Sequence, residues 1–454
     1  MKIGLEVHVQ LRTQTKMFCG CPNRHEEKPN TLTCEYCLGM PGSKPVLNAA
    51  TVDAAIKIGL ALNCAFPKEM FFSRKSYFYP DMGKNFQITQ YEMPVASKGS
   101  CEIGGRKIGI TRVQMEEDPA RIVHEKTHIL VDYNRSGVPL CEIVTEPDFG
   151  SPKEARLFLQ HLASILEYLG VMEPSMEGSM RVDANVSTES ERVEIKNVTG
   201  FKEVERALNY EIIRQRGVLR RGQAVKRETR GWDAATGVTR AQRSKEEEDD
   251  YGYIFEADLP RITLAKEKIE AIGKILPELA EQKMKRYAKM GVMPELAKAI
   301  VSEIDLAQAF EKVAESVEPA LAAKWFAGEI KKTLNYADLR MKDTGIKPQQ
   351  VAKLVCMVKD GKLTDRAAEM IFRKMVEKPD EPEKLAKGMQ AIGSEEEIEA
   401  LAKEALKENA KAVEDYKAGK KESFNFLVGQ VMKKTKGRAK PDAVKAVMEK
   451  LLGK

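Results

Sequence analysis

The sequence predicts an α+β fold in which a mixed region of strands and helices is followed by a nearly all-helical region. Residues 1 to about 262 are rich in Gly, Pro, Tyr and β-branched residues, and they alternate apolar with polar side chains as strands do. From about residue 263, Ala, Glu, Lys, Leu and Met recur with helical periodicity and the strand signals disappear. The first region is therefore expected to contain strands, and the second to be built of helices.

Three domains are predicted along the chain. Its 454 residues exceed the usual size of a single domain. In the helical region, breaks at Glu377–Pro382 and Gly393–Ser394 separate a middle block from a terminal one. The acidic run Lys245–Asp250 is expected to form a mobile loop. The predicted domains are residues 1–262, 263–392 and 393–454.

Alternating side chains mark the candidate strands. Near the N-terminus, Glu6, His8 and Gln10 alternate with aliphatic residues, so these three should share one face of a strand. Residues 181–187 and 193–196 alternate in the same way on either side of a short polar turn. They predict a hairpin with one polar face.

One clear helix is predicted between these strands. Ser151, Pro152 and Glu154 form a capping-box start with proline at the first helical position. Apolar residues then recur up to Leu169, and Gly170 ends the pattern. The sequence therefore predicts both ends of this helix.

Composition limits the class of protein. Hydrophobic residues make up 43% and charged residues 31%, which is typical of a globular protein and not of a disordered or fibrous one. No segment approaches the roughly 20 apolar residues that a membrane span needs. Glu6 and His8 interrupt the first apolar stretch, which argues against a signal peptide. We expect a cytoplasmic protein with no membrane partner.

The net charge of +6 is concentrated at one end of the chain. Residues 417–454 carry 11 Lys or Arg against 3 Asp or Glu, which gives +8 there and −2 elsewhere. This pattern is expected of an arm that binds a polyanion. The alternative is a solvated helical surface, which charge alone favours.

Half of the eight cysteines fall within nineteen residues, at Cys19, Cys21, Cys34 and Cys37. Two close pairs on two turns suit tetrahedral coordination of Zn²⁺ by four thiolates, and a cytosolic setting favours metal over disulfides. Such a site has no open coordination position and would be structural. The alternatives are four unrelated reduced thiols and a zinc ribbon that binds nucleic acid.

Acidic residues gather where apolar stretches meet loops. The candidates are Glu6 with His8 on one strand face, the run Glu116–Asp118, and the pair Glu142 and Glu146. A site of three carboxylates suits Mg²⁺, which commonly holds nucleotide phosphates, and a histidine ligand leaves room for Mn²⁺. The alternative is a set of ordinary exposed polar faces.

A basic and aromatic segment offers groups for a nucleotide. Arg74, Lys75, Tyr77, Tyr79 and Lys84 could neutralise phosphates and stack on a base, although an amphipathic strand and a turn would have the same pattern. The chain has no G-x-x-x-x-G-K-[ST] loop and no G-x-S-x-G motif. If this protein uses ATP, it does so without a common phosphate loop.

Six long motifs occur in order along the chain. They are Gly4–Leu11, Tyr77–Asp81, Gln87–Gln90, Met115–Asp118, Glu142–Asp148 and Arg181–Ser187. Shorter ones follow at Lys196–Asn197, Arg227–Arg230, Asp250–Tyr251 and Gly429–Met432. In these motifs the sequence resembles the GatB family of the aspartyl/glutamyl-tRNA amidotransferases, and the resemblance covers essentially the whole chain.

The resemblance implies an N-terminal cradle domain with a kinase-like site, then a helical domain, then a small helical tail domain of the YqeY type that contacts tRNA. Carried over by position, the family's magnesium ligands and catalytic residues fall on Glu6, His8, Glu117 and Glu142. The family's zinc ligands fall on Cys19, Cys21, Cys34 and Cys37. For ATP, the candidate residues are Tyr77, Lys84, Asp183, Asn185 and Ser187.

The resemblance also implies a ligase reaction. ATP would phosphorylate the side-chain carboxylate of Glu-tRNA(Gln) or Asp-tRNA(Asn), and ammonia would displace phosphate to leave the amide. Activation is needed because a carboxylate is a poor acyl donor, and the main task of the protein would be positioning. No histidine of the sequence falls in a pattern that pairs it with Cys or Ser. The resemblance implies that the chemistry of ammonia release lies in partners, an amidase-type glutaminase, GatA, and a small third protein, GatC.

Three other interpretations compete with this one. A non-enzymatic, zinc-containing tRNA-binding protein would need only the cysteines and the basic tail. It would have no reason to gather Glu6, Glu117 and Glu142, since acids repel phosphate. The related GatE family carries an inserted domain that has no counterpart in this sequence. A stand-alone ATP-dependent ligase is the third alternative.

Overall fold

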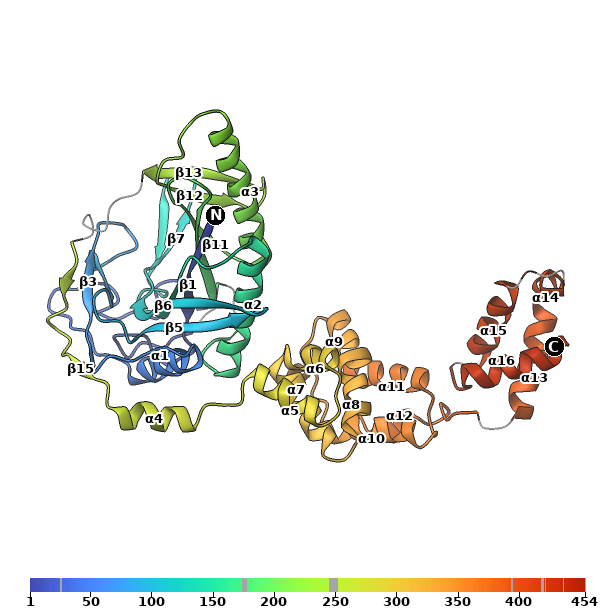
Figure 1. Cartoon of the computed structure of the whole chain (residues 1–454). Coiled ribbons are helices and arrows are strands. Elements are labelled where there is room, and N and C mark those ends of the chain that lie inside the picture. The colour runs from blue at the N-terminus through green and yellow to red at the C-terminus, as the bar shows by residue number, and fades with distance from the viewer. Residues whose placement is uncertain are drawn as a thin grey trace. The chain divides into compact units, whose positions relative to one another are not determined.

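The computed structural model describes residues 1–24, 27–173, 178–244, 252–392, 395–417, 420, 422–435 and 437–453. The chain forms two compact units, Met1–Leu279 and Ala280–Lys454 (Figure 1). Strands lie in the first unit, and the described residues of the second form helices, so the predicted α+β class is confirmed. The acidic run Lys245–Asp250 and the Gly393–Ser394 break lie outside the described residues.

An eight-stranded sheet forms the centre of the first unit. Its strands are β1 Lys2–Gln10, β5 Ala96–Ile103, β6 Arg106–Glu117, β9 Pro139–Thr145, β10 Met180–Ser187, β11 Val193–Val198, β12 Glu228–Asp233 and β13 Val238–Ser244. Their order is β13-β12-β11-β10-β1-β9-β6-β5, and all neighbours are antiparallel except β11 and β12. The predicted N-terminal strand therefore lies inside the sheet, between β10 and β9.

Helices bury one face of this sheet. They are α2 Pro152–Tyr168 and α3 Phe201–Arg220, which run side by side along it (Figure 1), while α1 Ala49–Ala61 packs on β5 and β6. Leu5, Val7 and Val9 of β1 are at most 1% exposed and belong to the same apolar cluster as these helices. Because side chains alternate along a strand, Glu6 and His8 lie on the opposite face.

Two local predictions are confirmed. At the start of α2, the Ser151 hydroxyl accepts a hydrogen bond from the Glu154 backbone N–H at 3.2 Å, and the Glu154 carboxylate accepts one from Gly150 at 2.9 Å. The helix ends at Tyr168, close to the predicted stop. Strands β10 and β11 form the predicted antiparallel hairpin.

Shorter strands form three small sheets, ordered β14-β3-β4, β15-β2 and β7-β8. Their bounds are β2 Glu69–Met70, β3 Ser73–Ser76, β4 Phe86–Thr89, β7 Arg121–His124, β8 Ile129–Asp132, β14 Ile254–Phe255 and β15 Ile262–Thr263. Arg74 of β3 donates two hydrogen bonds, of 2.7 and 2.8 Å, to the fully buried carboxylate of Glu256. This ion pair anchors the segment after β14 to the body of the unit.

Helix α4 Lys266–Lys274 packs on α1 in the first unit, and the remaining helices form the second. These are α5 Ala280–Lys289, α6 Pro294–Val301, α7 Ile304–Ala314, α8 Pro319–Trp325, η2 Phe326–Ile330, α9 Lys331–Ala337, η3 Met341–Asp343, α10 Pro348–Lys359, α11 Asp365–Glu377, α12 Pro382–Leu385, α13 Glu395–Glu408, α14 Ala410–Lys417, α15 Glu422–Lys434 and α16 Pro441–Leu452. Two apolar clusters lie in this unit, one within residues 287–386 and one within 392–448. The division into three domains stays a prediction.

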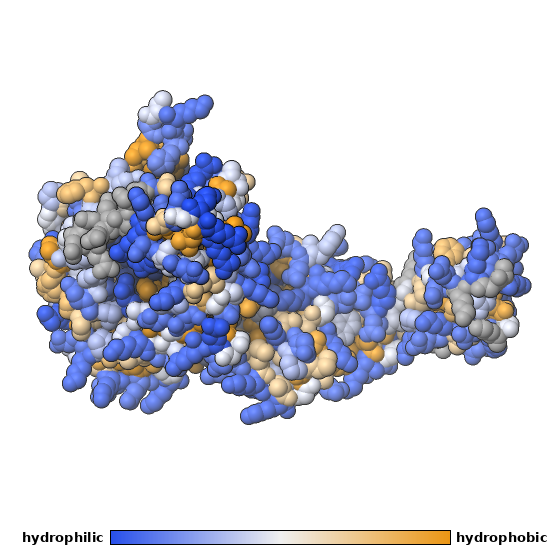
Figure 2. All heavy atoms as spheres, turned by 45° about the horizontal axis from the view of Figure 1, so that its top comes forward, coloured by the Kyte–Doolittle hydropathy of each residue, from blue (hydrophilic) through white to orange (hydrophobic). Residues whose placement is uncertain are grey.

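Hydrophilic residues cover most of the surface seen in Figure 2, with apolar residues scattered among them. Scattered apolar residues are normal for the surface of a folded protein. Among the helices of the described residues, none has both the length and the apolar character that a membrane crossing requires.

The packing of α2 on the sheet leads to a stability prediction. Phe158 of α2 is fully buried, with its ring 5.3 Å from that of Phe149. Phe158→Ala should therefore destabilise the first unit by about 3–5 kcal/mol through lost burial and a cavity. The neighbouring Leu157 is 38% exposed, so Leu157→Ala should change stability by only about 0.5 kcal/mol.

Urea unfolding measures both changes. The chain has two tryptophans, Trp232 in β12 and Trp325 in α8. In a Trp325→Phe background, fluorescence therefore reports the first unit alone. Equal midpoints for the two alanine variants would contradict the packing described above.

Candidate active site

The polar residues of β1 lie between two strands that carry acids of their own. Glu6 pairs with Asp183 of β10, and His8 pairs with Glu142 of β9 and with Arg181 of β10. In antiparallel strands, directly paired residues have their side chains on the same face. The predicted shared face of Glu6 and His8 is confirmed, and it is lined by the side chains of three adjacent strands.

One group on this face consists of His8, Glu116 and Glu142, each of which offers a ligand atom within 4.8 Å of the other two. His8 Nε2 lies 3.4 Å from Glu116 Oε1 and 3.9 Å from Glu142 Oε2. Gln114 donates to Glu142 at 2.6 Å, and the Thr89 hydroxyl donates to Glu116 at 3.3 Å. These hydrogen bonds orient the two carboxylates toward the histidine.

A second group, next to the first, consists of Glu6, Asp183 and Glu194, again with ligand atoms within 4.8 Å of one another. Asn185 donates to Glu6 at 2.8 Å, and the Asn197 backbone N–H donates to Asp183 at 2.7 Å. Glu194 accepts a hydrogen bond from Thr229 at 3.1 Å. Each carboxylate is thus held in place from a neighbouring part of the sheet.

Negative charge is crowded at both groups. Burial raises the pKa of Glu116 to about 7, and the charge of Glu142 adds to the rise. Burial also raises the pKa of Glu6, with further contributions from Glu142 and Glu194. For His8, burial alone would lower the pKa, but Glu142 and Glu116 outweigh it and raise the pKa. A bound cation would relieve this repulsion, and carboxylate oxygens with one imidazole fit Mg²⁺ or Mn²⁺.

The predicted ligand Glu117 lies elsewhere. It forms an ion pair with Lys84, and its carboxylate accepts hydrogen bonds from Tyr36 at 3.3 Å and from the Ile88 backbone N–H at 3.0 Å. Of the four residues predicted to hold magnesium, the structure thus joins His8 with Glu142 and places Glu6 in the neighbouring group. The assignment of Glu117 as a ligand stays a prediction, and the geometry favours Glu116 in its place.

Two residues of these groups, Glu116 and Glu194, were not given a role from the sequence, although Glu116 belongs to the candidate run Glu116–Asp118. The signal for Glu116 was its position two residues after Gln114 on β6, which places both side chains on one face. Gln114 pairs with Glu142 across the strands. The signal for Glu194 was its place on the polar face of the hairpin, where it pairs with Asn185. Alternation could therefore have found both, once the pairing of the strands was known.

The four clustered cysteines come together as predicted for a metal site, with all sulfurs within 4.8 Å of one another. Cys37 Sγ lies 3.6 Å from that of Cys19 and 3.8 Å from those of Cys34 and Cys21. A tetrahedral site with Zn–S bonds of about 2.3 Å places its sulfurs about 3.8 Å apart, whereas a disulfide needs about 2.05 Å. The spacing therefore fits Zn²⁺.

Lys16 supports the thiolate form of one cysteine. Its side chain is fully buried, and its ammonium donates to the Leu32 carbonyl at 2.8 Å and to Cys37 Sγ at 3.4 Å. The hydrogen bond from Cys19 lowers the pKa of Cys37 to about 4, with burial opposing the shift and Lys16 adding to it. Thiolates are the form that binds metal.

The residues predicted to contact ATP do not all lie together in the structure. Asn185 and Ser187 line a cavity of about 350 Å³ beside Glu6, together with Lys2 and Arg192. Asp183 belongs to the second acid group, and Lys84 lies with Glu117. Tyr77, in the segment after β3, has a pKa raised first by burial. From the same segment, Phe78 and Tyr79 are exposed.

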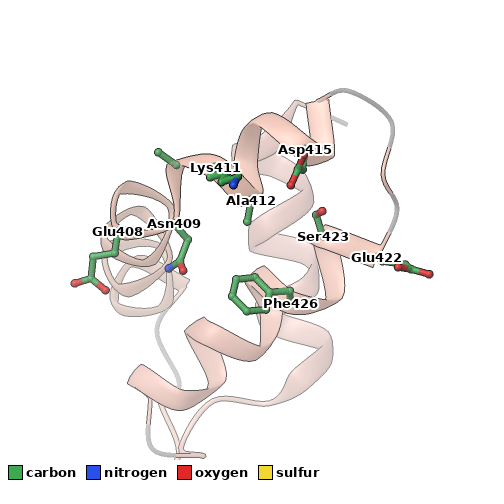
Figure 3. A pocket seen from close by; sticks show the side chains of 9 residues that line it. Glu408, Asn409, Lys411, Ala412, Asp415, Glu422, Ser423 and Phe426 are labelled. Atoms are coloured by element: carbon green, nitrogen blue, oxygen red, sulfur yellow. The ribbon is translucent and has the colours of Figure 1, made fainter.

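The terminal helices enclose a hollow of about 520 Å³ (Figure 3). Phe426 of α15 extends into it, with Asn409 and Ala412 nearby. Glu408, Asp415 and Glu422 line it as well, and Lys411 is the one basic residue among the described residues of the lining. This acidic lining is unsuited to a polyanion.

Two protein-family models match this chain, and together they cover most of its length. The family model described as the GatB/GatE catalytic domain matches residues 1–270, and the model described as the GatB domain matches residues 308–452.

Individual relatives match over nearly their whole length. The B subunit of the aspartyl/glutamyl-tRNA(Asn/Gln) amidotransferase of Methanospirillum hungatei JF-1 is 45% identical, over 100% of this chain and 98% of the relative. The proteins of the same name from Thermotoga maritima and Methanosarcina barkeri are 44% and 47% identical, over 99% and 97% of this chain and 98% and 95% of the relatives. The chain therefore belongs to the GatB family of the aspartyl/glutamyl-tRNA(Asn/Gln) amidotransferases.

Proposed function

We propose that the polar face of the eight-stranded sheet is where ATP phosphorylates the side-chain carboxylate of Glu or Asp on a misacylated tRNA. The observation that carries the proposal is the pair of acid groups around Glu6 and His8. A protein that only binds RNA gains nothing from such acids, because they repel phosphate. Family membership supports the same reaction, since the relatives are named for this amidotransferase.

Each acid group would hold one divalent cation, Mg²⁺ or Mn²⁺. The first would use His8, Glu116 and Glu142, and the second Glu6, Asp183 and Glu194. The chemistry that such cations supply is neutralisation of charge on the phosphate oxygens of ATP. The hydrogen bonds from Gln114 and Asn185 would keep the carboxylates in place while the nucleotide enters and leaves.

The nucleotide itself would occupy the cavity beside Glu6. Asn185 and Ser187 offer hydrogen bonds there, and Lys2 and Arg192 offer positive charge. Its volume of about 350 Å³ is in the range of small-molecule sites. This placement would set the phosphates toward the acid groups, because Glu6 belongs to both the cavity and the second group. Tyr77 and Lys84 stay predicted nucleotide contacts that this cavity does not include.

Positioning would then be the main contribution of the protein. The sheet would hold ATP and the aminoacyl carboxylate in line, so that the terminal phosphoryl group passes to the carboxylate oxygen with ADP as the leaving group. Ammonia attacks the resulting acyl phosphate, phosphate leaves, and the amide is formed. The ammonia would come from an amidase-type glutaminase, GatA, held with this chain by the small protein GatC in the cytoplasm.

Replacing either carboxylate of the first group should test the site. In the assembled enzyme, Glu116→Ala or Glu142→Ala should slow ATP-dependent phosphorylation of the misacylated tRNA by about a hundredfold or more, because charge stabilisation is lost. Binding of tRNA should be retained. Phosphate release on addition of misacylated tRNA measures the step, and Glu102→Ala, on the exposed side of β5, is the control.

Cation binding gives a second readout. In electron paramagnetic resonance titrations, Mn²⁺ should bind more weakly to Glu116→Ala and should bind normally to the control, Glu102→Ala. Near-normal phosphorylation by both Glu116→Ala and Glu142→Ala would contradict the proposed site. If Glu117→Ala loses Mn²⁺ binding while Glu116→Ala keeps it, Glu117 is the ligand, as the resemblance implied.

Residues 417–454 of the tail would bind the tRNA, since they carry the surplus positive charge. Lys433 and Lys445 are exposed, and among the described residues neither has an ion-pair partner. Replacing both by Gln should weaken tRNA binding and lower the slope of log affinity against log salt by about 1.5. Titration calorimetry at several salt concentrations measures this. The control is the same change at Lys266 and Lys274 of α4. Unchanged tRNA affinity in the tail variant would show that these basic residues are only a solvated helical surface.

Zinc is proposed for the four cysteines, as a structural metal. Each purified chain should carry one equivalent, and the double variant Cys34→Ser with Cys37→Ser should lose it, because two of four ligands are gone. Cys356→Ser, in the second unit, should keep it. Elemental analysis gives the metal content directly. A full equivalent in the double variant would show that these thiols do not form the site.

A further inference from the structure

The turn between two of the clustered cysteines reaches the acids of the central sheet. Tyr36 lies between Cys34 and Cys37 and is 5% exposed. Its hydroxyl lies 3.4 and 3.3 Å from the two carboxylate oxygens of Glu117. The side chain thus spans from the cysteine turn to strand β6.

Lys84 completes this contact. Its ammonium forms hydrogen bonds with the hydroxyl of Tyr36 and with the carboxylate of Glu117, and it lies 4.0 Å from the centre of the Tyr36 ring. Its side chain is 8% exposed and that of Glu117 is 2% exposed. Buried ions need their hydrogen-bond partners, so Tyr36 is a necessary member of this group.

The backbone makes a second connection between the same two loops. Gly39, which ends the cysteine turn, has φ +66° and lies directly on the carbonyl group of Gly83, one residue before Lys84. A Cβ at Gly39 would overlap that carbonyl. The cysteine turn therefore packs closely against the loop that carries Lys84.

Glu117 in turn positions the first acid group. Its carboxylate accepts from the Ile88 backbone N–H at 3.0 Å, and its own carbonyl accepts from Gln87 at 2.7 Å. These contacts join β4 to the end of β6. The preceding residue, Glu116, contacts His8, and its carboxylate accepts from Thr89 of the same β4. A shift of Glu117 is thus transmitted to Glu116 by the backbone they share.

We propose that Tyr36 is a positioning residue that links the four-cysteine cluster to the acid group of His8, Glu116 and Glu142. Metal at the cysteines would fix the turn, the turn would fix Tyr36, and Tyr36 would hold Lys84 and Glu117 in the arrangement that places Glu116. The effect of Tyr36 on the reaction rate rests on the proposed phosphorylation. The structural link from the cysteines through Tyr36 to Glu116 does not depend on it.

Hydrogen exchange measured by mass spectrometry tests the link without any assay of activity. In the full chain, Tyr36→Phe should raise the exchange of backbone amides in residues 84–88 several-fold and keep one equivalent of zinc. Cys34→Ser with Cys37→Ser should raise the same amides, as well as those of the cysteine turn. Unchanged exchange in residues 84–88 after loss of zinc would overturn the proposal, whatever the chain proves to catalyse.

Kinetics of the assembled enzyme test the consequence. Tyr36→Phe should lower kcat for ATP-dependent phosphorylation on the order of tenfold, since small misplacements of reacting groups are costly, with KM for ATP changed by less than about twofold. The matched control is Tyr287→Phe, which removes a buried hydroxyl that donates to the Glu311 carboxylate at 2.8 Å in the second unit. It should lower stability and leave kcat unchanged.

The outcomes separate the two proposals. Reduced thermal stability of Tyr36→Phe with an unchanged kcat would show a structural role only and would overturn the positioning role. Faster exchange in residues 84–88 in a protein that phosphorylates no aminoacyl-tRNA would keep the link and refute the proposed function. Slower phosphorylation with normal zinc and faster exchange would support both.

Discussion

Burial of the aliphatic side of β1 is the constraint on which the rest of the first unit depends. Leu5, Val7 and Val9 are almost fully buried, and each such side chain contributes about 1.5–3 kcal/mol when removed from water. Because alternate residues face opposite ways, this burial fixes Glu6 on the open face beside Glu142, Asp183 and Glu194, whatever the repulsion among these carboxylates costs. The apolar core thus holds like charges together that would separate if the strand were free.

Two basic side chains near the first acid group, Arg181 and Lys84, are engaged by other acids. Arg181 is paired with His8 across the strands, yet its guanidinium donates at 2.8 Å to the fully buried side chain of Asp118. Lys84 is held by Glu117 in the same manner. The protein thus neutralises the acids behind the site with its own cations. The acids in front, Glu116 and Glu142, face His8, and in the proposed function a divalent cation would neutralise them.

The sequence predicted regular features well and irregular ones poorly. The cap of α2 at Ser151 and the β10–β11 hairpin depend on neighbouring residues alone, and both were found. The choice between Glu116 and Glu117 depends on which way a residue faces at the end of β6, and β6 contains a register shift between Ile110 and Arg112. Such an irregularity reverses the alternation, so counting along the strand does not settle the facing. Glu194 lies between the hairpin turn and the shift in the β10–β11 pairing, so alternation gave its face but not its closeness to Glu6.

The place of β1 in the sheet has a consequence for how the protein is made. This strand leaves the ribosome about 130 residues before β9, the earlier of its two partners. At synthesis rates of 5–20 residues per second, it waits roughly 6–26 s without a neighbour. During that time its aliphatic side chains and its unpaired backbone are both accessible, which makes the nascent segment a substrate for chaperones and a starting point for aggregation. The strand that organises the finished domain is thus exposed for much of its translation.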